Sequence, residues 1–99
     1  MYLDSYINQI IGLCKIYNVK HLFVFGSVLN NNFNEDSDID FIVDIKSEDP
    51  IEYAENYFNF KFKLQSIINK PIDLLEEKGV KNSFLLKNIN DTKKLIYEA

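Results

Sequence analysis

The first part of the chain carries apolar residues at helical spacing. From Ile7 to Tyr17 they recur at every third or fourth position, which predicts a helix over about residues 5–17. Asp4 or Ser5 stands where a capping side chain would accept hydrogen bonds from the first turn. Cys14 falls within the apolar stripe, so we expect it to lie in the core.

Two strands are expected next. The apolar run from Leu22 to Phe25 ends at Gly26, which predicts a buried strand closed by a turn. From Asp38 to Asp44 apolar and mostly acidic residues alternate, which predicts a strand with one apolar and one largely acidic face. Only antiparallel pairing of the two strands brings the turn at Gly26 close to the acidic residues that begin the second strand.

The second half of the chain predicts a helix, a strand and another helix. Asp49-Pro50 opens a long helix that reaches about Asn69. Pro71 to Leu75 predicts a third strand, and Asn82 to Asp91 predicts a last helix. The segment from Leu95 to Tyr97 either extends that helix or adds an edge strand. We therefore expect an α/β (α+β) fold: a small mixed sheet of three to four strands with helices packed on one face.

The long helix carries two apolar stripes, more than a surface helix needs to face one core. The first comprises Tyr53, Tyr57, Phe60, Leu64 and Ile67, and the second comprises Ile51, Ala54, Phe58 and Phe62. Two explanations stay open for the second stripe. Either the terminal segments of the domain wrap it, or it faces a partner, which can be another protein or a second copy in a homo-oligomer.

Length and composition narrow the choice of function. The chain has 99 residues, of which 46% are hydrophobic, so we expect residues 1–99 to form a single domain. The net charge of −4 gives no reason to expect a nucleic-acid template as partner. With one cysteine, no basic and apolar leader and no run of about 18 apolar residues, we expect a cytoplasmic protein without a membrane partner.

Two short motifs carry the candidate chemistry. Gly26 lets a phosphate approach the backbone, and Ser27 adds a hydroxyl where free N–H groups favour an anion. Asp38 and Asp40 lie two residues apart in a strand, so both carboxylates leave the same face, about 6.5–7 Å apart at Cα. Mg²⁺ is typically held by one or two carboxylates together with phosphate oxygens and water, which fits this pair better than zinc.

Asp73 lies on the matching face of the third strand. It either completes a two-metal arrangement or acts as the base for an attacking hydroxyl. Taken alone, a Gly-Ser pair is most often only a turn, and an Asp-Ile-Asp segment is a solvated strand edge. Their agreement in register favours function, because three carboxylates on one face repel one another unless a cation is bound.

At these residues the sequence resembles the minimal nucleotidyltransferases of the DNA polymerase β superfamily. Phe25-Gly26-Ser27 is followed, after ten residues, by Asp38-Ile39-Asp40, and the segments Pro71 to Leu75 and Leu95 to Glu98 follow in the family's order. The resemblance implies a nucleotidyltransferase-like fold over nearly the whole chain.

The resemblance also implies the roles of the site residues. By it, Gly26 and Ser27 hold the triphosphate of ATP, Asp38 and Asp40 bind Mg²⁺, and Asp73 is the third acidic residue of the catalytic and metal site. It further implies Mg²⁺-dependent transfer of AMP from ATP to a hydroxyl of a partner, a tyrosine of a HEPN-type toxin, with this chain as the antitoxin. The alternative is a non-catalytic antitoxin that neutralises its partner by contact.

One departure from the family concerns positive charge. Many relatives carry Ala-Arg-Gly shortly after the Gly-Ser pair, whereas Val28-Leu29-Asn30-Asn31 stands here, without a basic side chain. Lys20, Lys46 and Lys81 are the candidate substitutes, although each is expected to be a solvated surface charge. His21, the only histidine, is expected to be partly buried rather than a base.

Overall fold

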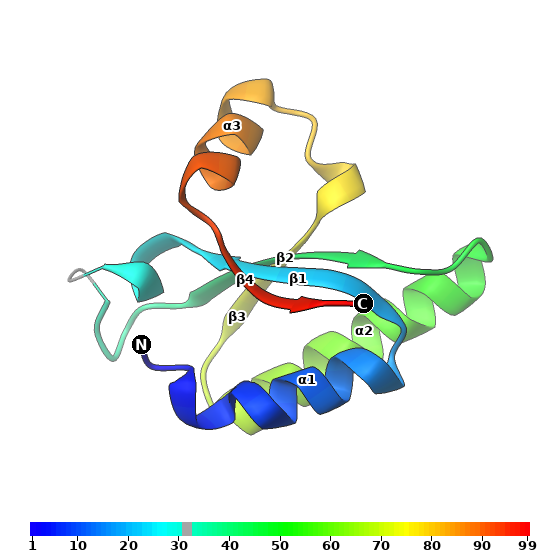
Figure 1. The fold of residues 1–99 in the computed structure, drawn as a ribbon, viewed down its shortest axis with the longest axis horizontal. Coiled ribbons are helices and arrows are strands. Elements are labelled where there is room, and N and C mark those ends of the chain that lie inside the picture. Colours follow the sequence, from blue (N-terminus) through cyan, green and yellow to red (C-terminus); the bar gives the residue numbers. More distant parts are fainter. Residues whose placement is uncertain (31–32) are drawn as a thin grey trace.

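A four-stranded sheet organises the molecule. The computed structural model describes residues 1–30 and 33–99, and its strands follow the order β3-β2-β1-β4 (Figure 1). Their bounds are β1 (Val19–Phe25), β2 (Ile39–Ile45), β3 (Ile72–Glu76) and β4 (Lys94–Glu98). β1 is antiparallel to both β2 and β4, whereas β2 and β3 are parallel. The expected small mixed sheet and the antiparallel pairing of the first two strands are both confirmed.

Helices lie on both sides of this sheet. The described residues form the helices α1 (Ile7–Ile16), α2 (Pro50–Ile68) and α3 (Ser83–Thr92), and the short 3-10 turns η1 (Asp4–Tyr6), η2 (Gly26–Leu29) and η3 (Glu77–Gly79). α1 and α2 lie together against one face, as expected, while α3 stands over the opposite face (Figure 1). Of the described helices, one stands over this second face and two lie against the first (Figure 1), so we call the face that carries α3 the open face.

Side-chain caps fix the ends of two helices but not of the first. Asp49 accepts a hydrogen bond from the Ile51 N–H at 3.0 Å, and Asn69 ends α2 in the left-handed conformation, with φ 59°. Asn82 caps α3 in the same way. The expected cap of the first helix is wrong, because Asp4–Tyr6 forms a 3-10 turn that runs into α1, and no side chain caps it.

The alternative at the end of the chain is decided in favour of a strand. Lys94–Glu98 forms β4, which pairs with β1 and places Tyr97 opposite Leu22. Lys93, just before it, has φ −63° and ψ 151°, so the helix cannot continue through this residue.

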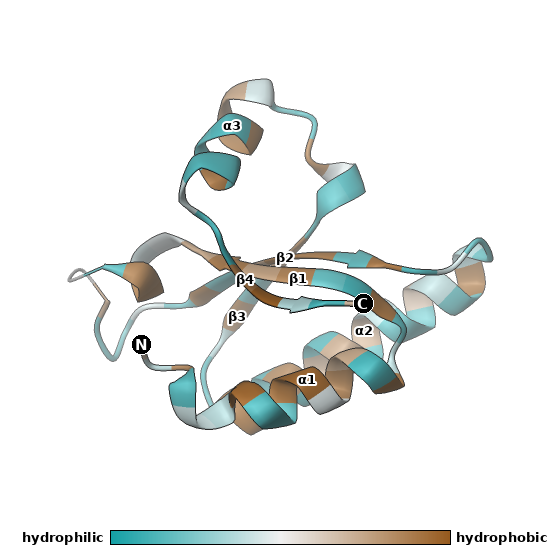
Figure 2. Cartoon of the chain, viewed as in Figure 1, coloured by the Kyte–Doolittle hydropathy of each residue, from teal (hydrophilic) through white to brown (hydrophobic). Residues whose placement is uncertain are grey.

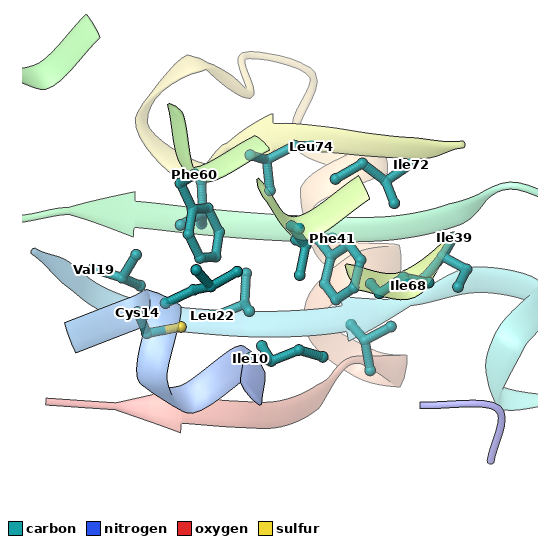
Figure 3. Close-up of a cluster of buried hydrophobic side chains, with 14 of the residues drawn as sticks. Ile10, Cys14, Val19, Leu22, Ile39, Phe41, Phe60, Ile68, Ile72 and Leu74 are labelled. Atoms are coloured by element: carbon teal, nitrogen blue, oxygen red, sulfur yellow. The ribbon is translucent and has the colours of Figure 1, made fainter. Parts of the chain in front are cut away.

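The core fills the space between the sheet and the pair α1 and α2. Phe41 of β2, Phe60 of α2 and Ile10 of α1 are fully buried and point into one cluster (Figure 3). Brown, apolar positions follow α1, β1 and β2 in Figure 2. Cys14 belongs to this cluster, and burial raises the pKa of its thiol to about 12, so the expectation that it is a core residue is confirmed.

The two stripes of α2 differ in burial. Phe60 and Leu64 of the first stripe are buried. Ile51, Phe58 and Phe62 of the second stripe are 71%, 65% and 69% exposed, so the terminal segments do not wrap them. We call this second stripe the outer face of α2. No helix of the described residues is both long and apolar enough to cross a membrane.

Substitutions of the buried Phe60 and the exposed Phe62 should therefore have different effects on stability. We expect Phe60→Ala to lower the free energy of unfolding by about 3–5 kcal/mol, because it empties a filled core site. Phe62→Glu should change it by no more than about 0.5 kcal/mol, since the side chain is solvated. Urea denaturation followed by circular dichroism measures both. A loss for Phe62→Glu comparable to that of Phe60→Ala would show that the outer face belongs to the core.

Candidate functional site

The open face of β2 changes character along the strand. Asp38, just before β2, is exposed and Asp40 is partly buried, but Ile42 and Asp44 are only 2% and 6% exposed. The sequence pattern predicted a largely acidic face along this whole segment. Only its beginning is available to a ligand, because Ile42 and Asp44 are buried.

The backbone of Gly26 lies so close to the Asp40 side chain that no residue with a Cβ would fit. Its φ of 82° is in the left-handed region, and an added Cβ would overlap Oδ2 of Asp40. The strand register explains this proximity, because Phe25 of β1 lies opposite Asp40 of β2. The turn that begins with Gly26 and Ser27 thus lies directly against the carboxylate of Asp40.

The third carboxylate comes from the neighbouring parallel strand. Asp73 of β3 is the register partner of Asp40, and adjacent strands lie about 4.8 Å apart. Burial raises the pKa of Asp40, and the negative charges of Asp73 and Asp38 raise it further. The structure therefore places Gly26 against Asp40, with the charges of Asp38 and Asp73 close enough to affect Asp40. Ser27 follows Gly26 in the same turn.

The donor set suits a hard cation. Its candidate ligands are carboxylate oxygens, and Asp40 sits among negative charges that a cation would neutralise. In the described part of the chain, no three His, Cys, Asp or Glu side chains are close enough to hold a metal ion by themselves. This arrangement fits Mg²⁺, which usually takes one or two carboxylates and completes its shell with phosphate oxygens and water.

The other end of the open face forms a separate polar cluster. His21 Nε2 donates a hydrogen bond to Glu77 Oε2, and Lys78 Nζ lies 3.5 Å from Asp44 Oδ1. His21 of β1 lies opposite Asp44 of β2. The pairs His21–Glu77 and Asp44–Lys78 therefore attach η3 to neighbouring positions of the sheet. The expectation that His21 is partly buried is confirmed. Its partner Glu77 could not be found from local spacing, because the two residues are 56 positions apart.

Among the described residues, no lysine forms an ion pair with Asp38, Asp40 or Asp73. All 11 basic residues of the chain are lysines. Lys20 and Lys46 are exposed and lie at the ends of β1 and β2 remote from Gly26, about 20 Å away at the usual rise per residue. Lys81 is also exposed, with its Nζ 3.5 Å from the Lys78 carbonyl. Asn31, which falls where relatives carry the basic motif, lies outside the described residues.

A cleft opens between the Gly-Ser turn and α3. It has a volume of about 600 Å³. Its lining residues are Phe25, Gly26, Leu29, Asn30, Leu85, Asn88, Ile89 and Thr92. Phe84, next to Leu85 on α3, is 80% exposed and is not part of the lining. Sequence reasoning missed Asn88 and Thr92, although their spacing from Leu85 puts them on the same helix face.

The raised pKa of Asp40 predicts that its ionised carboxylate lowers the stability of the folded protein when no metal is bound. The folded protein holds the Asp40 proton more tightly than the unfolded chain, so ionisation of Asp40 destabilises the fold as pH rises through the folded-state pKa. We expect Asp40→Asn to raise the melting temperature in chelator at neutral pH. The gain should vanish at about pH 3, where the carboxyl is protonated in both states.

The exposed Asp36 supplies the control, because Asp36→Asn makes the same change outside the cluster. Scanning calorimetry at both pH values measures the effect. A lower melting temperature for Asp40→Asn at neutral pH would show that the carboxylate supports the fold instead.

Comparison with known proteins gives the family. A family model described as polymerase beta nucleotidyltransferase matches residues 8–99. Two proteins of Methanocaldococcus jannaschii, named as candidate protein adenylyltransferases, are 31% and 33% identical over 81 residues. Each match covers 82% of this chain and 78% of the relative.

Solved structures share the fold. The structure of a protein named as a candidate minimal nucleotidyltransferase has a TM-score of 0.77 at 22% identity, covering 93% of this chain and 90% of that one. A chain of a toxin–antitoxin complex with AMP-PNP has a TM-score of 0.71 at 22% identity, covering 94% and 73%. A chain of a Shewanella oneidensis complex, in which an MNT antitoxin binds a tri-AMPylated HEPN toxin, has a TM-score of 0.66 at 20% identity, covering 100% and 74%.

At these identities the solved structures bear on the fold alone. The sequence match over residues 8–99 and the M. jannaschii relatives confirm the resemblance first carried by the Gly-Ser and Asp-Ile-Asp motifs. The chain belongs to the polymerase β family of nucleotidyltransferases.

Proposed function

We propose that the chain is a Mg²⁺-dependent protein adenylyltransferase, and that residues 1–99 form its single catalytic domain. It would transfer AMP from ATP to a hydroxyl of a partner protein, a tyrosine of a HEPN-type toxin, and so act as an antitoxin. The observation that carries the proposal is the position of Asp40, between the turn at Gly26 and the neighbouring Asp73. The names of the relatives, and the complexes in which structural neighbours occur, support the choice of AMP and of a HEPN-type partner.

Each site residue then has a role. The backbone at Gly26 and the hydroxyl of Ser27 bind phosphate oxygens of the nucleotide, because no Cβ blocks the approach. Asp38 and Asp40, at the start of the adjacent strand, would hold Mg²⁺. Bound Mg²⁺ neutralises the negative charge of the phosphates and stabilises the charge that develops in the transition state.

The transfer itself needs positioning and one proton acceptor. The hydroxyl oxygen of the acceptor forms a bond to the α-phosphorus, the bond from that phosphorus to its bridging oxygen breaks, and pyrophosphate leaves. Asp73 is exposed and lies next to Asp40, so its carboxylate accepts the hydroxyl proton at the edge of the same site. The alternative role of Asp73 as a further metal ligand uses the same carboxylate.

Two observations favour a second candidate function, neutralisation of a partner by contact alone. The chain has no arginine to bind phosphates, and the outer face of α2 offers exposed Phe58 and Phe62 to a partner. The two functions differ in whether AMP is added. Both require contact with the partner, so Phe62→Glu would weaken either function without touching the site residues.

We expect ATP binding to require Mg²⁺, since the triphosphate and the aspartates of the site are both anionic. Calorimetric titration of ATP with Mg²⁺ and with excess chelator measures this directly. Gly26→Ala should also weaken Mg²⁺·ATP binding, because the added Cβ overlaps Asp40 and the left-handed φ becomes strained. Equal ATP affinity with and without Mg²⁺ would remove the basis of the proposal.

We further expect labelled AMP to pass from ATP to a co-expressed HEPN-type partner. Asp38→Asn and Asp40→Asn should each lower this transfer by about 100-fold or more, because they remove metal ligands needed in the transition state. The control Asp36→Asn should transfer at the wild-type rate. Autoradiography and intact mass of the partner measure the product. Neutralisation of the partner by the wild-type chain without any added AMP would support the contact function instead.

A further inference from the structure

The cleft beside Gly26 has the size and the position of a ligand pocket. Its volume of about 600 Å³ lies within the roughly 300–1,000 Å³ that small-molecule sites occupy. It borders the turn proposed to hold phosphates, and it extends from there towards α3. A molecule with its phosphates at Gly26 would therefore have its remaining part directed along this cleft or away into solvent.

The walls of the cleft are apolar on two sides. Phe25 and Leu29 line it from the strand and the turn, and Leu85 and Ile89 line it from α3. Ile89 is 2% exposed, yet it stands outside the main core cluster, on the open side of the sheet. Such opposed apolar surfaces suit a flat aromatic ring, whose faces lose contact with water when it enters.

The polar side chains of the cleft lining are Asn30, which follows η2, and Asn88 and Thr92 of α3. Thr92 Oγ1 donates a hydrogen bond to the Asn88 carbonyl at 2.9 Å, so this hydroxyl is already used. The side-chain amide of Asn88 is exposed, and no hydrogen bond to it is found within the described residues. An asparagine amide carries a donor and an acceptor side by side, the pair that matches N7 and the N6 amino group of adenine.

We propose that this cleft is the nucleobase pocket and that Asn88 selects adenine over guanine. The proposal rests on the proposed function, since it places the base of the same nucleotide whose phosphates lie at Gly26. The base is tethered to those phosphates, so it reaches the cleft without a second binding event. Guanine presents an oxygen where adenine presents the amino group, so the Asn88 amide would lose one of its two hydrogen bonds.

The test is a set of calorimetric titrations of the full chain with Mg²⁺·ATP, Mg²⁺·GTP and Mg²⁺·tripolyphosphate. We expect ATP to bind at least about 10-fold more tightly than tripolyphosphate, because the base adds apolar contact and hydrogen bonds. Asn88→Ala should lower the ATP affinity about 5- to 10-fold, remove most of the preference over GTP and leave tripolyphosphate binding unchanged.

Asn90→Ala is the matched control. Asn90 lies on the same helix and is exposed, but it is not part of the cleft lining. It should leave all three affinities unchanged, and equal melting temperatures of the variants would show that α3 is intact.

The outcomes separate this inference from the function on which it rests. Equal affinities for ATP and tripolyphosphate, or an ATP affinity that Asn88→Ala does not change, would overturn the base pocket and leave the phosphate and metal site standing. If Asn88→Ala instead weakened only the binding of the acceptor protein, the cleft would be an acceptor site and the proposal would be wrong. Failure of both ATP and tripolyphosphate to bind would overturn the proposed function together with the pocket.

Discussion

The antiparallel pairing of β1 and β2 is the constraint on which the site depends. This pairing sets Phe25 opposite Asp40, so the end of one strand and the start of the next meet at one edge of the open face. Gly26 then turns the chain with a positive φ at the only kind of residue that tolerates both this conformation and the adjacent carboxylate. A one-residue slip of the register would turn Asp40 towards the core and destroy the site.

The parallel strand β3 adds the third carboxylate, and its charge repels that of Asp40. Asp73 is placed beside Asp40 by register, and its charge opposes the ionisation of Asp40. Without a cation, the sheet would be more stable with uncharged residues in place of Asp40 and Asp73. The fold keeps the carboxylates in place through the core on its other face, where Phe41 and Ile39 of the same strand are fully buried. The strand thus uses one face for stability and the other for a charge arrangement that only a cation relieves.

Much of this arrangement could be predicted from the sequence, because the relevant signals are local. Strand periodicity put Asp38 and Asp40 on one face, and Pro50, Asn69 and Gly26 marked ends and turns. The rest depended on contacts between distant segments. The position of α3 over the open face follows from the path of the chain after η3, which no periodicity records. The ion pair between Asp44 and Lys78 of η3 joins residues 34 positions apart, so the alternating pattern of β2 alone could not show that Asp44 is buried.

The absence of arginine shapes the chemistry that remains possible at this site. A guanidinium binds phosphate with two parallel hydrogen bonds and stays charged in any surroundings, whereas lysine acts as a point charge. Lys20 and Lys46 lie at the far ends of β1 and β2 from Gly26, and Lys81 lies exposed in the loop before α3. Without a guanidinium, the proposed function relies on Mg²⁺ and the backbone N–H groups of the turn to neutralise the triphosphate. Because these groups act on the phosphates whatever the base, discrimination between nucleotides has to come from the other end of the ligand, where the cleft under α3 lies.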